Sequence, residues 1–415
     1  MDNKKNGIPK LRFPGFTGAW EQRKLGEVAT THARIGWQNL RTSEFLDSGY
    51  YMLITGTDFK NGAIDFSNIH YVEKERYDQD KNIQLKGENI LVTKDGTLGK
   101  VAYIDKLPKP ATLNAGVFNI KVVDKTVVYP QYLFQYLKAP FLLKFASEQS
   151  TGGTIKHLNQ GVLVKFPIPL PSIGEQEKIV KFLNHVDSLI ALHQRKLEHL
   201  QEQKKGLLQK MFPKNGETVP EVRFPGFTDA WEQRKLSSMT QYKNGKGHED
   251  KQTDSGDFEL VNLNSISIDG GFKHSGKFIN ESDDGILYKN DLVMILSDVG
   301  HGDLLGRVAL IPDDNKFILN QRVALLRPNK TVNPEFLFFY INSHQKYFKS
   351  QGAGMSQLNI SKKSVETFSS LVPNIDEQKK ISLFLMKLDS LITLHQRKLD
   401  HLELMKKGLL QQMFV

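Results

Sequence analysis

The chain lacks features that mark several common classes of protein. It has no cysteine, which excludes a disulfide framework and thiolate metal sites and is typical of a reducing compartment. No apolar run approaches the ~20 residues that a membrane-spanning helix needs. The polar start, Met-Asp-Asn-Lys-Lys-Asn-Gly, is unlike a signal peptide. We therefore expect a soluble, cytoplasmic protein.

What the chain does have is an internal repeat. Residues 175–212 and 377–414 match at 26 of 38 positions when aligned at an offset of 202. A shorter block, Arg-Phe-Pro-Gly-Phe-Thr, occurs at 12–17 and again at 223–228. Between block and long repeat, each half holds a variable segment that is large enough to bury a core of its own. The same repeated blocks therefore flank two different variable segments.

Each long repeat has the periodicity of a coiled-coil helix. Apolar residues recur at steps of 4 and 3 from Ile179 and from Ile381, passing through His193 and His395 near the midpoints. At 1.5 Å per residue such a helix is a rod of roughly 57 Å, and the first must end before Pro213. We predict that the two helices pair as an antiparallel coiled coil with a pseudo-twofold axis. The histidines then form a polar layer that sets the register, because a metal site needs more ligands.

The apolar surface of these helices is wider than a two-stranded seam covers. Helices of the variable segments or of another protein must cover the rest, and the length of the rods favours another protein. The predicted partner interface consists of matched residues beside the seam: Phe182, Leu189, Leu192, Leu208, Phe212, Phe384, Leu391, Leu394, Leu410 and Phe414.

The net charge of +10 favours a polyanionic partner. In the first variable segment, residues 28–110 carry 11 basic and 11 acidic residues, whereas residues 111–171 carry 6 and 2. In the second, residues 249–314 carry 5 basic and 14 acidic residues, whereas residues 315–373 carry 8 and 2. A solvated face explains either segment alone. The recurrence of this basic enrichment in two divergent segments favours a shared role for the basic part of each segment.

Both variable segments are rich in short apolar runs broken by Gly, Asn and Asp, which is the pattern of strands and turns. They share a faint skeleton: the run at 89–93 matches 291–295, and Pro130 and Pro334 each open a predicted helix. We predict one α+β fold used twice with different surface residues. The expected parts of the chain are a first domain at 1–171, a first spacer helix at 172–212, a second domain at 213–373 and a second spacer helix at 374–415.

No catalytic motif is recognisable. Gly96-Thr-Leu-Gly-Lys-Val resembles a phosphate-binding loop only superficially, because the spacing before Gly-Lys and the residue after it are wrong. No two prolines are adjacent, so the Asn/Asp-Pro-Pro-aromatic motif of adenine methyltransferases is absent. The histidines form no helical ligand pair with an acid, and no metal site is expected. We predict that the chain is not an enzyme by itself.

The whole arrangement resembles the specificity subunit of type I restriction-modification enzymes, over nearly the full chain. The most specific elements are the helix entries Pro171-Ser-Ile-Gly-Glu-Gln-Glu-Lys-Ile and Pro373-Asn-Ile-Asp-Glu-Gln-Lys-Lys-Ile, the heptads after them and the doubled Phe-Pro-Gly-Phe block. The resemblance implies that each variable segment is a target recognition domain that reads one half of a bipartite site in double-stranded DNA. It also implies that the helices separate these domains and dock two modification subunits.

The resemblance places the chemistry in partner subunits. Modification subunits would bring S-adenosylmethionine and methyl transfer, and restriction subunits would add ATP-driven translocation and cleavage, with Mg²⁺. No cofactor is expected in this chain. Because the two variable segments diverge, the two half-sites should differ, which makes the DNA site asymmetric.

The candidate DNA-contacting residues are polar groups on turns and in the basic C-terminal parts of the two segments. Phosphate contacts supply affinity and base-edge contacts supply sequence, for which Arg and Gln are favoured at guanine and adenine. The candidates are Thr93, Lys94, Thr97, Lys100, Thr151, Thr154, Lys156, His157, Ser297, His301, Arg307, Gln321, Arg322, Ser356 and Gln357.

One alternative remains open on the sequence. The chain could be a coiled-coil scaffold whose two globular domains bind peptides or sugars and have no DNA role. The paired basic enrichment counts against it. A self-contained DNA methyltransferase or nuclease would need motifs that the sequence lacks.

Overall fold

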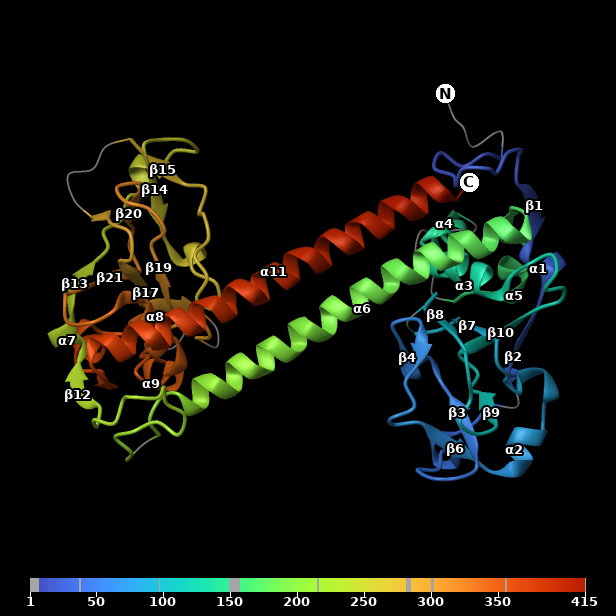
Figure 1. The fold of residues 1–415 in the computed structure, drawn as a ribbon, viewed down its shortest axis with the longest axis horizontal. Coiled ribbons are helices and arrows are strands. Elements are labelled where there is room, and N and C mark those ends of the chain that lie inside the picture. The colour runs from blue at the N-terminus through green and yellow to red at the C-terminus, as the bar shows by residue number, and fades with distance from the viewer. Residues whose placement is uncertain are drawn as a thin grey trace. The chain divides into compact units, whose positions relative to one another are not determined.

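The computed structural model describes residues 7–36, 39–96, 98–148, 157–214, 216–280, 285–299, 302–354 and 357–414. Contacts divide the chain into two compact units, Met1–His193 with Lys398–Val415, and Gln194–Arg397. Each unit contains one variable segment and part of each long helix (Figure 1). The C-terminal end of the chain therefore completes the first unit.

The two long helices are α6 (Ile173–Lys210) and α11 (Ile375–Met413). In the first unit the C-terminal part of α11 packs on the N-terminal half of α6, and Lys406 forms an ion pair with Asp187. In the second unit the matched residues Lys204 and Asp389 form the same pair, with 2.5 Å between Nζ and Oδ1. The start of each helix therefore lies beside the end of the other, which confirms the predicted antiparallel pairing.

The predicted heptad positions are buried or half-buried along both helices. Near the helix starts, Ile179, Leu183 and Val186 on α6 and Ile381 and Leu385 on α11 are almost fully buried. Their burial removes one stripe of each helix from water, which is the main stabilising contribution of an amphipathic helix.

A buried glutamine fixes the start of each long helix. Gln176 donates from Nε2 to the Pro171 carbonyl oxygen at 2.9 Å and accepts from the Tyr129 amide at 2.8 Å. The matched Gln378 makes the same two kinds of bond, both at 2.8 Å. Because a buried amide without partners costs roughly 1–3 kcal/mol, this side chain ties each long helix to the turn that precedes α3 (Pro130–Lys138) or α8 (Pro334–Ser343). The repeated Glu-Gln pair in the sequence therefore has a structural role.

The short block repeated in each half forms a clasp over the first turns of the long helix in its own unit. Arg12 donates to both carboxylate oxygens of Glu175 at 2.8 Å. Arg223 donates to both oxygens of Glu377 at 2.7 and 2.8 Å. Both glutamates are buried, and a bidentate arginine is the partner that best compensates a buried carboxylate.

The clasp also covers an aromatic residue of the helix. Phe13 packs edge-on against Phe182, and Phe224 packs edge-on against Phe384, with ring centroids 5.9 Å apart in each case. The doubled Phe-Pro-Gly-Phe motif is thus part of the frame that holds the helices.

The phenylalanine after each long helix is a buried plug. Phe414 lies among the rings of Trp20, Tyr132, Tyr136 and Phe141, with centroid distances from 5.1 to 6.4 Å. The end of α11 is therefore part of the core of the first unit.

Phe212 has the matched place in the second unit, among Trp231, Phe336 and Tyr340, at 5.1 to 6.3 Å. Phe212, Phe414 and Leu410 are 4%, 5% and 8% exposed. The prediction that these three residues belong to a partner interface is wrong, because they fill cores of this chain. Helical spacing alone does not distinguish a side chain that meets a partner from one that enters the chain's own domain.

The first variable segment folds into a mixed α/β domain around a four-stranded sheet in the order β2-β10-β7-β8. Strand β7 is buried on both faces, since Ile90 and Val92 face the core that contains the long helices and Leu91 faces a second core. A three-stranded sheet, β6-β3-β9, closes the second core, with β3 parallel to β9. The elements are β1 (Glu21–Lys24), α1 (Leu25–Val28), β2 (Ala29–Ala33), β3 (Tyr51–Ile54), β4 (Phe59–Lys60), β5 (Ala63–Ile64), β6 (His70–Val72), α2 (Lys74–Asp78), β7 (Ile90–Thr93), β8 (Val101–Tyr103), β9 (Ala111–Leu113), β10 (Val117–Val122), α3 (Pro130–Lys138), α4 (Phe141–Glu148), α5 (Gln160–Leu163) and β11 (Pro167–Leu170).

The second variable segment repeats this plan with the sheets β13-β21-β17-β19 and β15-β14-β20-β16. Alternation along β17 is the same, with Leu292 and Met294 in one core and Val293 and Ile295 in the other. The elements are β12 (Glu232–Lys235), α7 (Leu236–Met239), β13 (Thr240–Asn244), β14 (Phe258–Val261), β15 (Phe278–Ile279), β16 (Ile286–Leu287), β17 (Leu292–Ile295), β18 (Ser297–Val299), β19 (Val308–Leu310), β20 (Phe317–Leu319), β21 (Val323–Pro328), α8 (Pro334–Ser343), α9 (Gln345–Ser350), β22 (Gln357–Asn359), α10 (Lys362–Glu366) and β23 (Ser369–Val372). Helices α3 and α8 begin at their prolines, as expected from the sequence.

Candidate nucleic-acid interface

In the first unit, the turn after β7 meets the segment before α5. The Leu158 amide donates to the Lys94 carbonyl at 2.9 Å, and His157 Nδ1 contacts the Asp95 carboxylate. Lys100 lies on the other side of the same hairpin and is exposed. The segments that carry Lys94, Lys100 and His157 therefore meet at this hairpin, and we call these three residues the first turn cluster.

Thr93 does not belong to this cluster. It is completely buried at the end of β7, and its Oγ1 accepts a hydrogen bond from the Lys100 amide at 2.9 Å. The hydroxyl closes the hairpin between β7 and β8. The prediction that Thr93 contacts DNA is therefore wrong.

The second unit brings the matched segments together with different residues. Strand β18 pairs antiparallel with β22, and Gln357 donates from Nε2 to Ser297 Oγ. The Leu296 amide donates to the Arg322 carbonyl at 2.9 Å, and Arg322 and Gln321 form an exposed turn. Gln321, Arg322 and Gln357 therefore lie near the end of β17, and we call them the second turn cluster.

Ser297 and Arg307 differ from the prediction. Ser297 is 2% exposed, so its hydroxyl positions Gln357 and does not face solvent. Arg307 donates from Nη1 to the Asn342 carbonyl at 3.3 Å, and burial lowers its pKa. Its side chain is directed toward α8 and not toward the second turn cluster. Six further candidates, Thr97, Thr151, Thr154, Lys156, His301 and Ser356, lie outside the described residues.

Part of the basic enrichment serves the fold. Arg327 pairs with the buried Asp291 at 2.7 Å, and its guanidinium lies 4.5 Å from the centre of the Tyr288 ring. Lys138 pairs with Asp187 at 3.3 Å. A charge count along the sequence cannot separate these cations from those that remain available to a polyanion.

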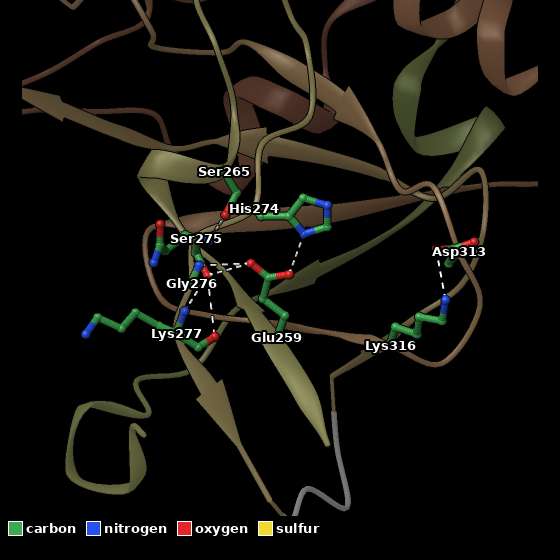
Figure 2. Close-up of polar contacts among 9 residues, drawn as sticks. Glu259, Ser265, His274, Ser275, Gly276, Lys277, Asp313 and Lys316 are labelled. Atoms are coloured by element: carbon green, nitrogen blue, oxygen red, sulfur yellow. Dashed lines mark hydrogen bonds and ion pairs between the residues drawn. The ribbon is translucent and has the colours of Figure 1, made fainter. Parts of the chain in front are cut away.

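Sequence reasoning missed a polar cluster in the second domain that has no counterpart among the described residues of the first. Figure 2 shows Glu259 on β14 directed toward His274 and Gly276. Its carboxylate accepts from His274 Nδ1 at 2.7 Å, from the Gly276 amide at 3.0 Å and from Ser275 Oγ at 3.3 Å. The matched position in the first domain is Met52, which cannot accept such bonds. Sequence comparison of the two halves could have singled out Glu259 as a charged residue within a β-strand.

The polar cluster around Glu259 holds the loop at residues 274–276 in place. Burial raises the pKa of Glu259, but the hydrogen bonds from His274 and Gly276 outweigh burial, so the pKa lies below its ordinary value. The carboxylate is ionised at neutral pH and its oxygens are occupied by loop donors. Glu259 therefore fixes residues 274–276 and has no free oxygen for acid or base chemistry.

A groove of about 1040 Å³ lies within the second unit between α8 and the long helices. Leu208, Phe339 and Ile392 form part of its apolar lining, and Lys205 and Arg307 also line it. In the first unit Lys138 occupies the place of Asn342 and pairs with Asp187. Leu208, predicted for a partner interface, is half-buried in this groove.

The remaining predicted partner residues lie at the surface of the long helices. Leu192, Leu391 and Leu394 are exposed, and Leu189 is half-buried. Phe182 and Phe384 are each covered on one side by the clasp, and Phe384 keeps 38% of its surface exposed. These matched residues leave an apolar strip on both helices.

Among the described residues, no group of three or more His, Asp or Glu side chains is arranged to hold a metal ion. No helix in the same part of the chain combines the length and apolar character needed to cross a membrane.

The chain is similar to specificity subunits over nearly its whole length. A putative type I restriction enzyme specificity subunit of Methanocaldococcus jannaschii, MjaX, is 24% identical over 424 residues, which cover 98% of this chain and 95% of the relative. The MjaVIII specificity subunit of the same organism is 24% identical over 376 residues, covering 87% and 84%.

Solved structures show the same fold. The crystal structure of the S subunit of a type I restriction-modification system from M. genitalium aligns with a TM-score of 0.64 at 16% identity, covering 98% of this chain and 99% of that chain. A structure that concerns complex assembly and conformational transition of the type I system aligns with a TM-score of 0.54, also at 16% identity, covering 97% and 98%.

The family model for the type I restriction modification DNA specificity domain matches this chain twice, at residues 18–202 and 228–404. Each match contains one variable domain and most of the long helix that follows it. The chain therefore belongs to the DNA specificity subunits of type I restriction-modification systems, which are non-catalytic and carry two target recognition domains.

Proposed function

We propose that each variable domain of this specificity subunit reads one half of an asymmetric bipartite DNA site. The observation that carries the proposal is the pair of turn clusters. Both lie at the end of the central strand, where His157 before α5 and Gln357 on β22 have matched places, yet the first cluster presents Lys94, Lys100 and His157 and the second Gln321, Arg322 and Gln357. Different side chains at the same end of the central strand are what two unlike half-sites require.

The side chains fit complementary parts of DNA recognition. Arg and Gln side chains can make bidentate contacts to guanine and adenine in the major groove, which favours Arg322 and Gln357 as base-reading residues, whereas lysines suit phosphate oxygens. His157 can donate to a base edge or to a phosphate. The first turn cluster is thus suited mainly to contacts with the DNA phosphates and the second mainly to contacts with the bases.

The long helices dock two modification subunits in this proposal. The matched apolar residues support two equivalent sites, because Phe182, Leu189 and Leu192 on α6 recur as Phe384, Leu391 and Leu394 on α11. The modification subunits supply S-adenosylmethionine and methyl transfer, and restriction subunits supply the steps that need ATP and Mg²⁺.

Methylome sequencing of cells that express this chain with its modification subunits tests the proposal. We expect methylation at one non-palindromic motif made of two specified parts and an unspecified spacer. The purified complex should also bind random duplex DNA more weakly, with an affinity that falls steeply as salt rises. Methylation without a bipartite motif would refute the proposal. Absence of any DNA affinity in the complex would favour the scaffold alternative.

A further inference from the structure

A segment outside both turn clusters borders the second one. It is Gly-Lys-Gly-His at 245–248, which directly follows β13. The backbone of Lys246 forms a parallel bridge with Asn320, the residue that precedes Gln321 and Arg322 in the chain. The segment 245–248 therefore runs beside the turn that carries two residues of the second turn cluster.

The chain passes this turn in direct backbone contact. The Gly245 amide donates to the Val323 carbonyl at 3.0 Å. A Cβ atom at residue 245 would lie only 1.7 Å from the Asn320 carbonyl oxygen, so no side chain fits there. Glycine is the residue that permits such a close approach of two backbones. Gly245 thus fixes the distance between the segment and the turn.

Asn320 connects the segment to the cluster through its side chain as well. Its Oδ1 accepts from the Gln321 amide at 2.9 Å and lies 3.5 Å from His248 Nδ1. Asn320 is buried, so its side chain is held between these two partners. A bridge at Lys246 and a ring contact at His248 therefore hold the segment at both of its ends.

The first domain uses the matched positions differently. At the offset of 211 that aligns the two halves here, Gly245 corresponds to Arg34 and Lys246 to Ile35. Arg34 is buried, and its Nε donates to the Leu113 carbonyl at 2.8 Å. Ile35 is exposed. The first domain thus directs a cation into its core at this border and exposes an apolar residue, whereas the second domain exposes Lys246.

The surroundings of Lys246 suit a DNA backbone. Gly245 and Gly247 flank it, so no neighbouring side chain in the sequence stands beside its ammonium. The nearest acid along the chain with a described side chain is Asp250, which follows beyond the half-buried His248. A lysine between glycines can therefore be approached closely by a phosphate.

The second turn cluster is short of cations for its task. It contains Arg322 and two glutamines, whereas the first contains Lys94 and Lys100. Most of the affinity of a protein for DNA comes from cations that neutralise phosphates, and base-reading side chains need such contacts to fix their register. A lysine beside the second turn cluster would supply what the cluster itself lacks.

We propose that Lys246 binds a phosphate of the half-site that the second domain reads, and that it holds the DNA backbone while Arg322 and Gln357 read bases. A lysine ammonium is a compact charge without base preference, which suits this role. The inference rests on the proposed function and names a contact of that same site. The equivalent phosphate contact of the first domain comes from its turn cluster instead.

Lys246→Gln in the complex with modification subunits tests the inference. The probe is a labelled duplex that carries the methylated motif, and binding is followed by fluorescence anisotropy over a range of salt concentrations. We expect roughly three- to tenfold weaker binding at low salt and a slope of log affinity against log salt that is smaller by about 0.9, the value for one phosphate. The methylated motif should stay the same, because no base contact is lost.

Two matched variants separate this contact from a general effect of charge. Lys289→Gln makes the same change at an exposed lysine that precedes the start of β17, at the other end of that strand from the second turn cluster. Ile35→Gln changes the matched residue of the first domain. Both variants should keep the wild-type salt slope.

Neutral phosphates locate the contact. Duplexes with a methylphosphonate at one position at a time cover both half-sites, and the half-site of the second domain is the one whose methylated motif changes in Arg322→Ala. One methylphosphonate in that half-site should weaken binding of the wild type but not of Lys246→Gln, because the two changes remove the same contact.

Four results would overturn the inference. They are an unchanged salt slope in Lys246→Gln, an equal change of slope in Lys289→Gln, a lost phosphate contact in the other half-site, and a relaxed motif in Lys246→Gln, which would mean base reading. In each case a bipartite motif that Arg322→Ala relaxes would leave the proposed function intact. Absence of any bipartite motif would instead refute the proposed function, and this inference with it.

Discussion

Arg322 is the residue whose backbone is most informative about the second domain. Its φ of 66° lies in the left-handed region, where a residue other than glycine or asparagine is uncommon. The matched place in the first domain is Gly116. Such a conformation costs of order 1–3 kcal/mol and persists where the surrounding structure enforces it. An exposed arginine held in this way at a turn cluster is suited to a recognition role.

We predict that Arg322→Ala weakens recognition by the second domain. Loss of a bidentate base contact should cost about 1–3 kcal/mol of binding, and the motif found by methylome sequencing should become relaxed at one position of one half-site. Arg322→Gly is the matched control, because it removes the same side chain and also relieves the backbone. Its thermal stability should equal or exceed that of the wild type while recognition is lost. An unchanged motif in both variants would contradict a role for Arg322.

Glu259 gives a pH-dependent prediction. Its pKa is below the ordinary value of 4.5 in the folded domain, so its contribution to stability is complete above that value and is lost as the pH falls through the folded pKa. We expect Glu259→Gln to destabilise the second domain by about 1–3 kcal/mol at pH 7, because the loop donors lose a charged acceptor.

Urea denaturation at pH 7 and at pH 3.5 measures this effect. The difference between wild type and Glu259→Gln should shrink as the pH falls below the ordinary value of 4.5, because protonation of the carboxylate removes the charged acceptor. Met52, at the matched place in the first domain, provides a control position, since Met52→Leu should leave the pH dependence unchanged. An equal difference at both pH values would show that the ionised carboxylate is not what stabilises the loop.

At the scale of elements, the ends of the long helices act as parts of the domain cores. Phe414 fills an aromatic site in the first unit and Phe212 fills the matched site in the second. The first domain is therefore completed by the end of α11, which is remote from it in the sequence. The second domain is completed by the end of α6, which precedes it.

We predict that the plugs act on different units. Phe414→Ala should cost about 3–5 kcal/mol in the first unit, because truncating a buried phenylalanine leaves a cavity. Hydrogen exchange should speed up in α3 of that variant and stay unchanged in α8. Phe212→Ala should give the reverse pattern. If both variants loosened the same helix, the assignment of each plug to one core would be incorrect.

The matched apolar strips give a prediction about assembly. Leu189→Asp combined with Leu391→Asp should abolish co-purification with the modification subunits, because a charge would replace an apolar contact in both proposed sites. The domains should remain folded, since Leu391 is exposed and Leu189 is half-buried. Leu391→Asp alone should leave one modification subunit bound. Undiminished co-purification of the double variant would refute the docking proposal.

At the scale of the whole molecule, we expect the repeat to make the two recognition domains exchangeable modules. The frame that holds each domain consists of the clasp, the buried glutamine and the plug, and it is the same in both halves. The variable segments differ within that frame.

Exchange of one variable segment should therefore change one half-site only. Replacing residues 26–166 by the corresponding segment of a related specificity subunit should alter one part of the methylated motif and keep the other part and its spacing. Replacing residues 237–368 should alter the other part. If either exchange changed both parts in the methylome, the modular proposal would fail.

Some of this architecture was accessible from the sequence alone. The heptads predicted the two long helices and their antiparallel pairing, because a 3.5-residue period leaves one stripe that only another helix can cover. The strand runs and the helix-opening prolines Pro130 and Pro334 predicted a mixed domain used twice. The absence of cofactor motifs correctly indicated a non-catalytic subunit, as family membership shows.

The candidate site was less accessible. Polar residues on turns pointed to segments that meet within each domain, yet Thr93 and Ser297 proved to be buried links between backbone segments. The side chain of Arg307 turned toward α8. The sequence shows that a turn residue is polar but not where its side chain points, because that direction depends on the segment that packs beside the turn.

The sequence by itself determined the order of the parts, the pairing of the helices and the family, because these depend on local periodicity and on repetition along one chain. Only the tertiary structure decided which repeated residues are structural. It assigned Arg12 and Glu175 to the clasp and placed Phe212 and Phe414 within cores. It also showed that Leu383 and Leu404 remain in solvent. The physical reason is that burial arises from contacts between residues far apart in the sequence, and an apolar residue at helical spacing looks the same whether such a contact exists or not.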